Sequence, residues 1–281
     1  MFFAFGGGKK SVTLHCFYMI YLIGMKLNES TQKWESPYWH PAVTVDAVVF
    51  GYDEVMCRER LHSNEDPCLS VLLIERGAEP FKGSWALPGG FIVQKDESAE
   101  AAVYRELHEE TNMDGIYLKE FKTYSKIGRD PRPDERVITI AFYALVDKRQ
   151  YHVVGGDDAT KAQWFAIDHL PELAFDHQEI VEDAFAQLQQ SVHFEPIAFH
   201  LLNKDSFTMS QLFMIYNAIL MPPKGSNIAN DRRNFMKKML SLGYVKRTGE
   251  VVRGLSNRPP ELFCFDEEVF KARKAREVRE F

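Results

Sequence analysis

The sequence predicts an α+β protein with two domains, and three observations lead to this prediction. Runs rich in β-branched residues, such as 42–52 and 137–146, alternate with amphipathic helical runs as far as residue 190. An irregular stretch with one proline follows, and the pattern then changes to two helices and a β-hairpin. A length of 281 residues is enough for two domains of ordinary size. We therefore expect five segments: a leader at 1–39, a first domain at 40–190, a linker at 191–206, a second domain at 207–267 and a charged tail at 268–281.

Charge is unevenly divided between the two halves of the chain. The composition, 45% hydrophobic and 26% charged, is typical of a globular protein, and the formal net charge is −6. Residues 200–281 carry 15 Lys and Arg against 9 Asp and Glu, whereas residues 1–199 carry 19 against 31. A basic C-terminal region behind an acidic body favours a polyanion as its partner, although chance unevenness is the alternative.

The four cysteines have neither metal-ligand spacing nor the pattern of a disulfide framework. They are Cys16, Cys57, Cys68 and Cys264. Their spacing is typical of free thiols in a reducing compartment, which predicts a cytoplasmic protein.

The N-terminal residues resemble a targeting signal only in part. Lys9 and Lys10 precede an apolar run at 11–24, which lacks a small-x-small cleavage site and is short for a membrane span. Met25 follows directly and begins a sequence typical of a cytosolic start. We therefore expect residues 1–24 to be a mis-called upstream extension or a disordered tail, and we expect no membrane association.

The stretch at residues 88–113, PGGFIVQKDESAEAAVYRELHEETNM, carries the clearest chemical signal. Ser98 is a suitable N-cap for a helix, and Glu100 suits the positive end of its dipole. Residues at four-residue spacing provide a face to bury: Ala99, Val103 and Leu107. The pattern therefore predicts a helix that begins just after Ser98.

Three glutamates project together from another face of this helix. Glu106, Glu109 and Glu110 stand at i, i+3 and i+4. Like charges so close together repel one another unless a cation lies between them. Because the ligands are all oxygen, the patch favours Mg²⁺ or Mn²⁺, and we predict that Glu106, Glu109 and Glu110 bind the metal.

This stretch resembles the signature of the Nudix family. The matching positions are Gly90, Glu97 and the run from Arg105 to Met113. The chain departs from the signature in having six residues rather than five between Gly90 and Glu97, and Asn112 in place of the last glycine. Asn tolerates the left-handed conformation that this position needs.

The resemblance implies a Nudix α/β/α sandwich with a mixed sheet, and metal-dependent hydrolysis of a diphosphate. It makes the following residues catalytic: Glu97, Arg105, Glu106, Glu109 and Glu110. It also implies that Gly89 and Gly90 let the backbone approach the phosphates. The alternative is that the glutamates form only a solvated acidic helix face.

A loop at residues 128–133 contains two arginines and two prolines, so it is preorganised for oxyanions. The same Arg-Asp-Pro-Arg run is familiar in Nudix proteins that bind ADP-ribose. We therefore predict that Arg129, Asp130 and Arg132 contact such a ligand; an exposed basic loop is the alternative. Further on, Asp176 is a candidate N-cap, and His177 is interpreted as a capping or surface histidine rather than a base.

The second domain has the order of a winged helix-turn-helix. Thr208 is the expected cap of a first helix, a basic helix spans 232–240, and strands at 244–253 and 261–265 flank a turn. Such a domain places the basic helix in the major groove and the wing on phosphates. We predict these DNA-binding residues: Arg232, Arg233, Asn234, Lys237, Lys238, Arg253 and Arg258.

The succession of a Nudix domain, FT-x-x-Q-L, RRNF and an Arg-Pro-Pro wing resembles the Nudix-related transcriptional regulators of the NrtR type. The resemblance covers residues 40–267. It implies a homodimer that binds double-stranded operator DNA and senses ADP-ribose or a related nucleotide or sugar. The alternative is a Mg²⁺-dependent pyrophosphohydrolase that converts ADP-ribose to AMP and ribose 5-phosphate, with a C-terminal domain that does not bind DNA. The complete glutamate set favours hydrolysis, and the longer gap before Glu97 opposes it.

Overall fold

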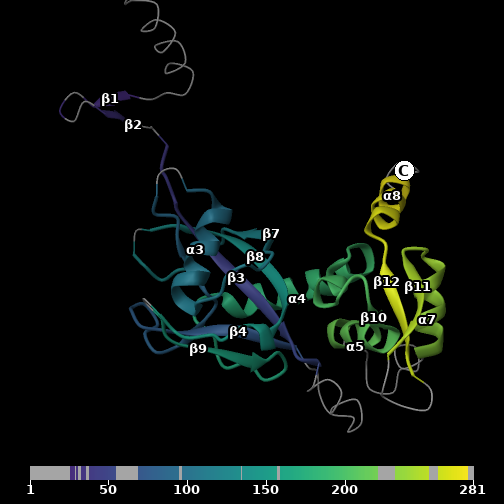
Figure 1. Cartoon of the computed structure of the whole chain (residues 1–281). Helices are drawn as coiled ribbons and strands as arrows, with labels where there is room; N and C mark the ends of the chain where they lie inside the picture. The colour runs from purple at the N-terminus through teal and green to yellow at the C-terminus, as the bar shows by residue number, and fades with distance from the viewer. Residues whose placement is uncertain are drawn as a thin grey trace, which may run out of the picture. The chain divides into compact units, whose positions relative to one another are not determined.

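The computed structural model describes these residues: 26–28, 30, 33–35, 38–54, 69–94, 97–133, 135–156, 159–220, 232–252 and 259–277. The chain divides into two compact units, Met1–Ala42 and Val43–Phe281. In the first unit, β1 (Lys26–Asn28) and β2 (Lys33–Glu35) pair antiparallel (Figure 1). Within the described ranges, no helix has the length and hydropathy to cross a membrane.

The main sheet of the second unit contains seven strands among the described residues. Its path is β5 (Trp85–Ala86), β4 (Leu69–Arg76), β3 (Ala42–Tyr52), β8 (Val137–Asp147) and β7 (Lys119–Tyr124), while β6 (Gly89–Phe91) pairs with β3 and β9 (Ala159–Ala166) pairs with β4. The pairs β3–β4, β3–β6, β4–β9 and β7–β8 are antiparallel.

The two faces of β3 are covered by different helices (Figure 1). Val45, Ala47 and Val49 belong to the same core cluster as the buried residues of α3 (Ala99–Thr111). Val48 and Phe50 belong to the cluster that contains the buried residues of α4 (His177–Phe194). Because successive side chains of a strand point to opposite faces, this alternation produces a helix–sheet–helix sandwich. The predicted Nudix α/β/α architecture is confirmed.

The C-terminal region is a winged helix. Its elements are η2 (Ile197–Leu201), β10 (Phe207–Thr208), α5 (Met209–Leu220), α7 (Arg232–Ser241), β11 (Val245–Val251), β12 (Glu261–Phe265) and α8 (Glu267–Glu277). Strands β10, β12 and β11 pair antiparallel in that order. The predicted order of helix, basic helix and hairpin is confirmed, and the sequence did not predict the short strand β10.

Helix α5 begins at a reciprocal cap. The backbone N–H of Gln211 donates to Thr208 Oγ1 at 3.2 Å, and the N–H of Thr208 donates to Gln211 Oε1 at 2.9 Å. This is a capping box, which satisfies two backbone donors at once. Thr208 is therefore the cap that the sequence predicted.

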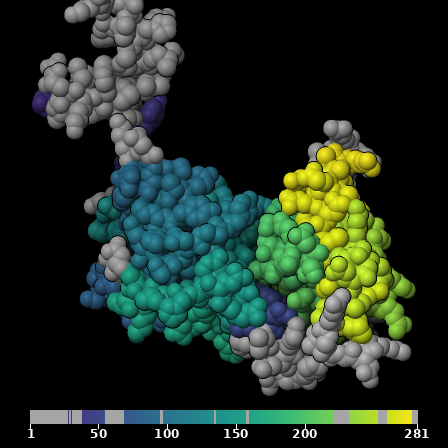
Figure 2. All heavy atoms as spheres, in the orientation of Figure 1, coloured from purple at the N-terminus to yellow at the C-terminus, as the bar shows by residue number. Residues whose placement is uncertain are grey.

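The segment predicted as a linker packs against its neighbours. Helix α4 continues four residues beyond the predicted end at residue 190, and its Val192 is buried. In η2, Phe199 is buried and stacks on Phe265 with ring centroids 4.2 Å apart. Most of the predicted charged tail lies in helix α8, whose mainly exposed residues are among those drawn yellow in Figure 2.

Candidate functional site

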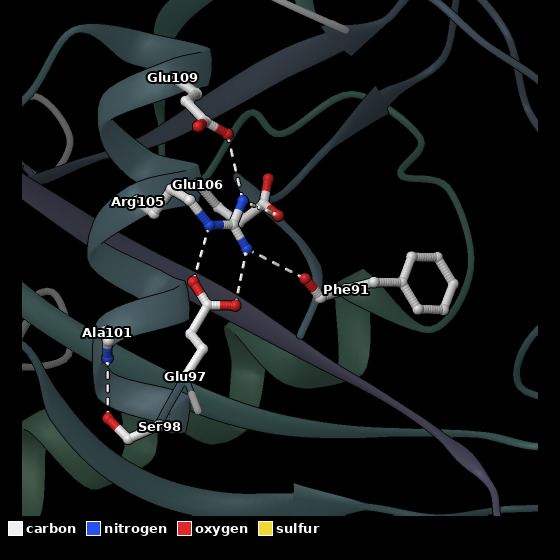
Figure 3. Close-up of polar contacts among 7 residues, drawn as sticks. All are labelled: Phe91, Glu97, Ser98, Ala101, Arg105, Glu106 and Glu109. Atoms are coloured by element: carbon white, nitrogen blue, oxygen red, sulfur yellow. Dashed lines mark hydrogen bonds and ion pairs between the residues drawn. The ribbon is translucent and has the colours of Figure 1, made fainter. Parts of the chain in front are cut away.

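Arg105 contacts three glutamates of the Nudix signature, which comprises Gly90, Glu97 and 105–113 and is called the box below (Figure 3). Arg105 Nε donates to Glu97 Oε1 at 2.8 Å, and its Nη2 donates to Glu97 Oε2 at 3.2 Å and to the carbonyl of Phe91 at 3.1 Å. Its Nη1 donates to Glu106 Oε1 at 2.7 Å and to Glu109 Oε2 at 3.1 Å. Arg105 lowers the pKa of Glu97, mainly through the side-chain hydrogen bond. The extra loop residue before Glu97 therefore leaves this carboxylate in contact with the helix arginine.

Both ends of α3 have the geometry that their residues predict. Ser98 Oγ accepts a hydrogen bond from the Ala101 N–H at 3.1 Å. Asn112 adopts the left-handed conformation with φ 57°, and its N–H donates to the carbonyl of His108. Asn112 thus replaces the glycine of the signature without loss of the helix end.

Glu110 is the most buried of the three predicted metal ligands. Its side chain accepts a hydrogen bond from the Gly89 N–H at 2.8 Å, and burial raises its pKa to about 8. Burial also raises the pKa of Glu106, in spite of the nearby Arg105. Carboxylates that lose hydration in this way gain from a cation beside them.

A fully assembled metal centre is not present among the described residues, where no three His, Cys, Asp or Glu side chains are grouped as ligands. Glu106 and Glu109 instead share Arg105 Nη1, each through one carboxylate oxygen. The donor set consists only of carboxylate oxygens, which fits Mg²⁺ or Mn²⁺. The residues therefore fit a divalent cation chemically.

Close packing explains why two glycines stand at the turn into the box. A Cβ atom at Gly90 would lie 2.4 Å from Glu106 Oε1, and one at Gly89 would lie 2.1 Å from the carbonyl oxygen of Val45. Both distances are far below van der Waals contact. The glycines thus let the Glu106 carboxylate and strand β3 approach the backbone, in addition to any approach by a ligand.

Two neighbouring cavities meet at this turn. The outer cavity, of about 350 Å³, is lined by all three glutamates of the box, and its size is in the range of small-molecule sites. The inner cavity, of about 60 Å³, is lined by polar residues from β3, the 128–133 loop and the start of α4, and by apolar residues that include Leu87, Val137 and Phe175. Both cavities are lined by Arg76, Gly89, Gly90, Phe91 and Arg132. A ligand that spans both would therefore contact the box and the inner residues together.

The three predicted loop residues all line the inner cavity, but they differ in their partners. The Arg132 guanidinium lies 4.8 Å from the centroid of the Phe91 ring, and the Arg132 N–H donates to Asp130 Oδ1 at 3.0 Å. Arg129 makes a two-point ion pair with Asp176, with Nε–Oδ2 at 2.9 Å and Nη2–Oδ1 at 2.7 Å. The side chain of Arg129 is only 5% exposed, so its charge is already matched inside the protein.

His177 is the clearest correction to the sequence interpretation. It is buried rather than exposed, and its Nδ1 accepts a hydrogen bond from the Leu87 N–H at 2.9 Å. Burial lowers its pKa, because the protonated ring would need solvent that is absent there. Asp176 is the N-cap residue of α4 as predicted, but its side chain bonds to Arg129 and caps no backbone N–H.

Sequence reasoning missed two residues of the inner cavity. Asp46 is buried on β3, with Oδ1 3.6 Å from His177 Nε2. Arg76, at the end of β4, lies 4.9 Å from the centroid of the Phe175 ring. The available signal for Asp46 was a carboxylate within a run of apolar strand residues, because a charged side chain is rarely buried unless it is paired.

The basic helix α7 presents its charges outward. Its exposed polar residues are Arg232, Arg233, Asn234, Lys237 and Lys238. Phe235 packs inward, with edge contacts to Phe213 and Tyr216 at centroid distances of 5.2 Å. The predicted basic helix is therefore amphipathic, while the predicted wing residues Arg253 and Arg258 lie outside the described residues.

Comparison with known proteins agrees with this geometry. Residues 55–184 match the NUDIX domain, and residues 198–265 match the NrtR DNA-binding winged helix domain. Over 146 residues, which are 52% of this chain and 74% of the relative, the chain is 39% identical to an ADP-ribose pyrophosphatase of Methanocaldococcus jannaschii. The crystal structure of Shewanella oneidensis NrtR complexed with a 27mer DNA is 28% identical, with a TM-score of 0.59 and coverage of 82% of this chain and 95% of that chain.

One relative matches this chain over most of its length. The chain is 30% identical over 237 residues to the ADPR responsive transcriptional repressor NtrR of Acinetobacter baylyi, with 82% of this chain and 84% of the relative covered. The predicted resemblance is thereby confirmed. The chain belongs to the NrtR family of Nudix-domain transcriptional regulators.

Proposed function

We propose that this protein represses transcription by binding operator DNA through its winged helix and responds to ADP-ribose bound in its Nudix domain. The main observation in support is that the same chain contains a cavity lined by the box glutamates and a winged helix with an exposed basic helix, α7. The A. baylyi relative, named as an ADPR-responsive repressor, supports the same assignment.

In this proposal, ADP-ribose lies across the two cavities. Arg76 and Arg132 line both of them and supply positive charge where a diphosphate would cross from one to the other. Asp46 and Asp130 line the inner cavity, where carboxylate oxygens accept hydrogen bonds from ribose hydroxyls. Arg129 lines the same cavity but is paired with Asp176, so a ligand anion reaches its guanidinium only in competition with that carboxylate.

We assign Mg²⁺ or Mn²⁺ to Glu106, Glu109 and Glu110. Glu106 and Glu109 each use one carboxylate oxygen for Arg105, which leaves the second oxygen of each carboxylate for a cation. When bound, such a cation shields the diphosphate charge and lowers the pKa of an attacking water. Arg105 holds the carboxylates of Glu97, Glu106 and Glu109 in fixed positions.

Hydrolysis of ADP-ribose to AMP and ribose 5-phosphate is the second candidate function. The complete set of box carboxylates and the contact of Glu97 with Arg105 favour it. The 39% identity to a pyrophosphatase over half of this chain supports it as well. Regulation and hydrolysis are compatible in one chain, because both begin with ADP-ribose in the Nudix domain while DNA binding uses the winged helix.

For DNA recognition, we propose that α7 enters the major groove and that its arginines and lysines contact phosphates and base edges. The wing residues Arg253 and Arg258 are proposed to contact phosphates. We further propose a cytoplasmic homodimer, because a two-fold dimer matches the two half-sites of an operator.

The test uses the full chain and a DNA duplex selected from a random-sequence pool. Fluorescence anisotropy of that duplex measures DNA affinity with and without ADP-ribose, and chromatography of ADP-ribose with Mg²⁺ measures AMP release. Sequence-selective binding that ADP-ribose alters supports the regulator. AMP release without sequence-selective binding would contradict it and establish the hydrolase. ADP-ribose binding without turnover would make the Nudix domain a sensor only.

A further inference from the structure

Helix α4 contacts the inner cavity at one end and the winged helix at the other. At its start, His177 lines the inner cavity, and the N-cap residue Asp176 is paired with Arg129. Near its end, Gln189 and Val192 contact helix α5. With 18 residues, α4 is about 27 Å long. A single regular element thus connects the two regions.

The contact at the start of α4 involves the loop at residues 128–133. Both carboxylate oxygens of Asp176 accept hydrogen bonds from Arg129, and no backbone N–H competes for them through capping. Arg129 lies in the cavity wall with Asp130 and Arg132. An anionic ligand beside Arg129 competes with Asp176 for the same guanidinium. We therefore expect an anion bound beside Arg129 to weaken its ion pair with Asp176 and so to change the contacts at the start of α4.

The contact at the end of α4 is equally specific. Gln189 Nε2 donates to the carbonyl oxygens of Ile219 at 3.1 Å and Leu220 at 3.4 Å. These are among the last carbonyls of α5, which lack partners within their own helix. The Tyr216 hydroxyl donates to the carbonyl of Val192 at 3.2 Å. Three hydrogen bonds from two side chains therefore connect α5 to α4.

The same tyrosine reaches the basic helix. The Tyr216 ring packs edge-on against Phe235 of α7, at a centroid distance of 5.2 Å, and Phe213 of α5 does so too. Tyr216 is buried, so a displacement of its hydroxyl displaces the ring as well. Because packed interiors shift between discrete arrangements rather than deform smoothly, a movement of α4 is passed on to α7.

We propose that α4 transmits ligand occupancy of the inner cavity to the DNA-binding helix, through the Arg129–Asp176 ion pair at its start and the Gln189 and Tyr216 hydrogen bonds near its end. This inference rests on the proposed function, since it presumes that ADP-ribose and DNA affect each other. The coupling is the ratio of DNA dissociation constants with and without saturating ADP-ribose, and such ratios are typically about 5- to 150-fold.

The experiment measures three quantities for each full-length variant: DNA affinity alone, ADP-ribose affinity alone, and the coupling ratio. We expect Gln189→Ala and Tyr216→Phe to keep both separate affinities within about threefold, while the ratio falls toward 1. Gln190→Ala, an exposed neighbour on the same helix, is the matched control and should keep the wild-type ratio. Tyr216→Phe keeps the ring on Phe235, so it tests the hydroxyl alone.

A double variant tests whether both ends lie on one route. Asp176→Asn weakens the ion pair, and its combination with Gln189→Ala should reduce the ratio no further than the stronger single change does. Wild-type coupling in both Gln189→Ala and Tyr216→Phe would overturn the inference, as would an equal loss in Gln190→Ala. If ADP-ribose left the DNA affinity of the unmodified protein unchanged, that result would instead contradict the proposed function.

Discussion

The helices α3 and α7 both carry clustered charges, but they direct those charges in opposite ways. In α3, Arg105 and Glu106 turn toward each other and toward the turn at Gly90, and Glu110 is almost fully buried. In α7, Arg233 and Lys237 are exposed while Met239 is buried. Charges gathered in a partly dehydrated pocket suit a small ion or a diphosphate. Charges spread over a surface suit an extended polyanion and act through counterion release.

The largest effect is expected when the outward charges are removed. Arg233→Ala combined with Lys237→Ala should weaken DNA binding about 100-fold at low salt, and should lower the slope of log affinity against log salt by about 2. Anisotropy titrations across a salt series measure both. The control pair is Lys274→Ala with Arg276→Ala on α8, which removes two exposed basic residues outside α7. DNA affinity that α7 substitutions leave unchanged would contradict the placement of α7.

Adding a methyl group at the glycine turn beside α3 should lower the stability of the protein and leave its DNA affinity unchanged. In Gly89→Ala the added Cβ would lie 2.1 Å from the carbonyl oxygen of Val45, a backbone atom of β3 that cannot turn aside, so we expect a loss of about 2 kcal/mol in the free energy of unfolding. Urea denaturation monitored by circular dichroism measures it. The α7 double variant should unfold at the wild-type urea concentration, which would sharpen the contrast. If Gly89→Ala also kept that midpoint, the close contact with Val45 would not constrain this position.

Removing one inward charge should weaken cation binding. Glu109→Gln retains the shape of the side chain but loses a carboxylate ligand, so we expect Mn²⁺ affinity to fall about tenfold. Electron paramagnetic resonance of free Mn²⁺ measures this without any need for turnover, and AMP release should fall in parallel if the protein is a hydrolase. DNA affinity in the absence of ligand should not change. Unaltered Mn²⁺ binding would remove Glu109 from the metal assignment.

The smallest effect concerns the pH dependence of stability at the inner cavity. Burial lowers the pKa of His177 below its ordinary value of 6.5, so its contribution is complete above about pH 6.5 and is lost as the pH falls toward its folded-state pKa. Asn can replace the acceptor for the Leu87 N–H but does not titrate. The stability advantage of the wild type over His177→Asn should therefore shrink between pH 7 and 5.5, by at most about 1.4 kcal/mol per pH unit.

Paired urea titrations at each pH measure this difference. The comparison with the variant matters because burial raises the pKa of Glu110 to about 8, which lowers stability as the pH rises in the same range. This effect is common to both proteins and cancels in the difference. A difference that does not vary with pH would show that His177 is not neutral by burial.

Local interactions account for what the sequence determined by itself. Ser98 caps α3 through a residue three positions away, Thr208 and Gln211 form a capping box over the same distance, and Asn112 has the conformation that its residue type tolerates. The β-branched residues along β3 predicted a strand without any knowledge of its neighbours. The spacing of the box residues along one helix likewise brought Arg105 beside Glu109. In each case the relevant partners are close in sequence, so the pattern is visible in the residues.

Only the tertiary structure decided how the inner site is built. Arg129 meets Asp176, 47 positions away, and His177 accepts its hydrogen bond from Leu87, 90 positions away. Helix α4 continues beyond its predicted end, and in this extension the carbonyl of Val192 accepts a hydrogen bond from the Tyr216 hydroxyl. Neither side chain type nor local spacing specifies such partners, because they depend on which elements the sheet brings together. Residue types therefore determined the helices, their caps and the box, while the packing of distant segments decided which charges are paired, which are buried and which remain for ligands.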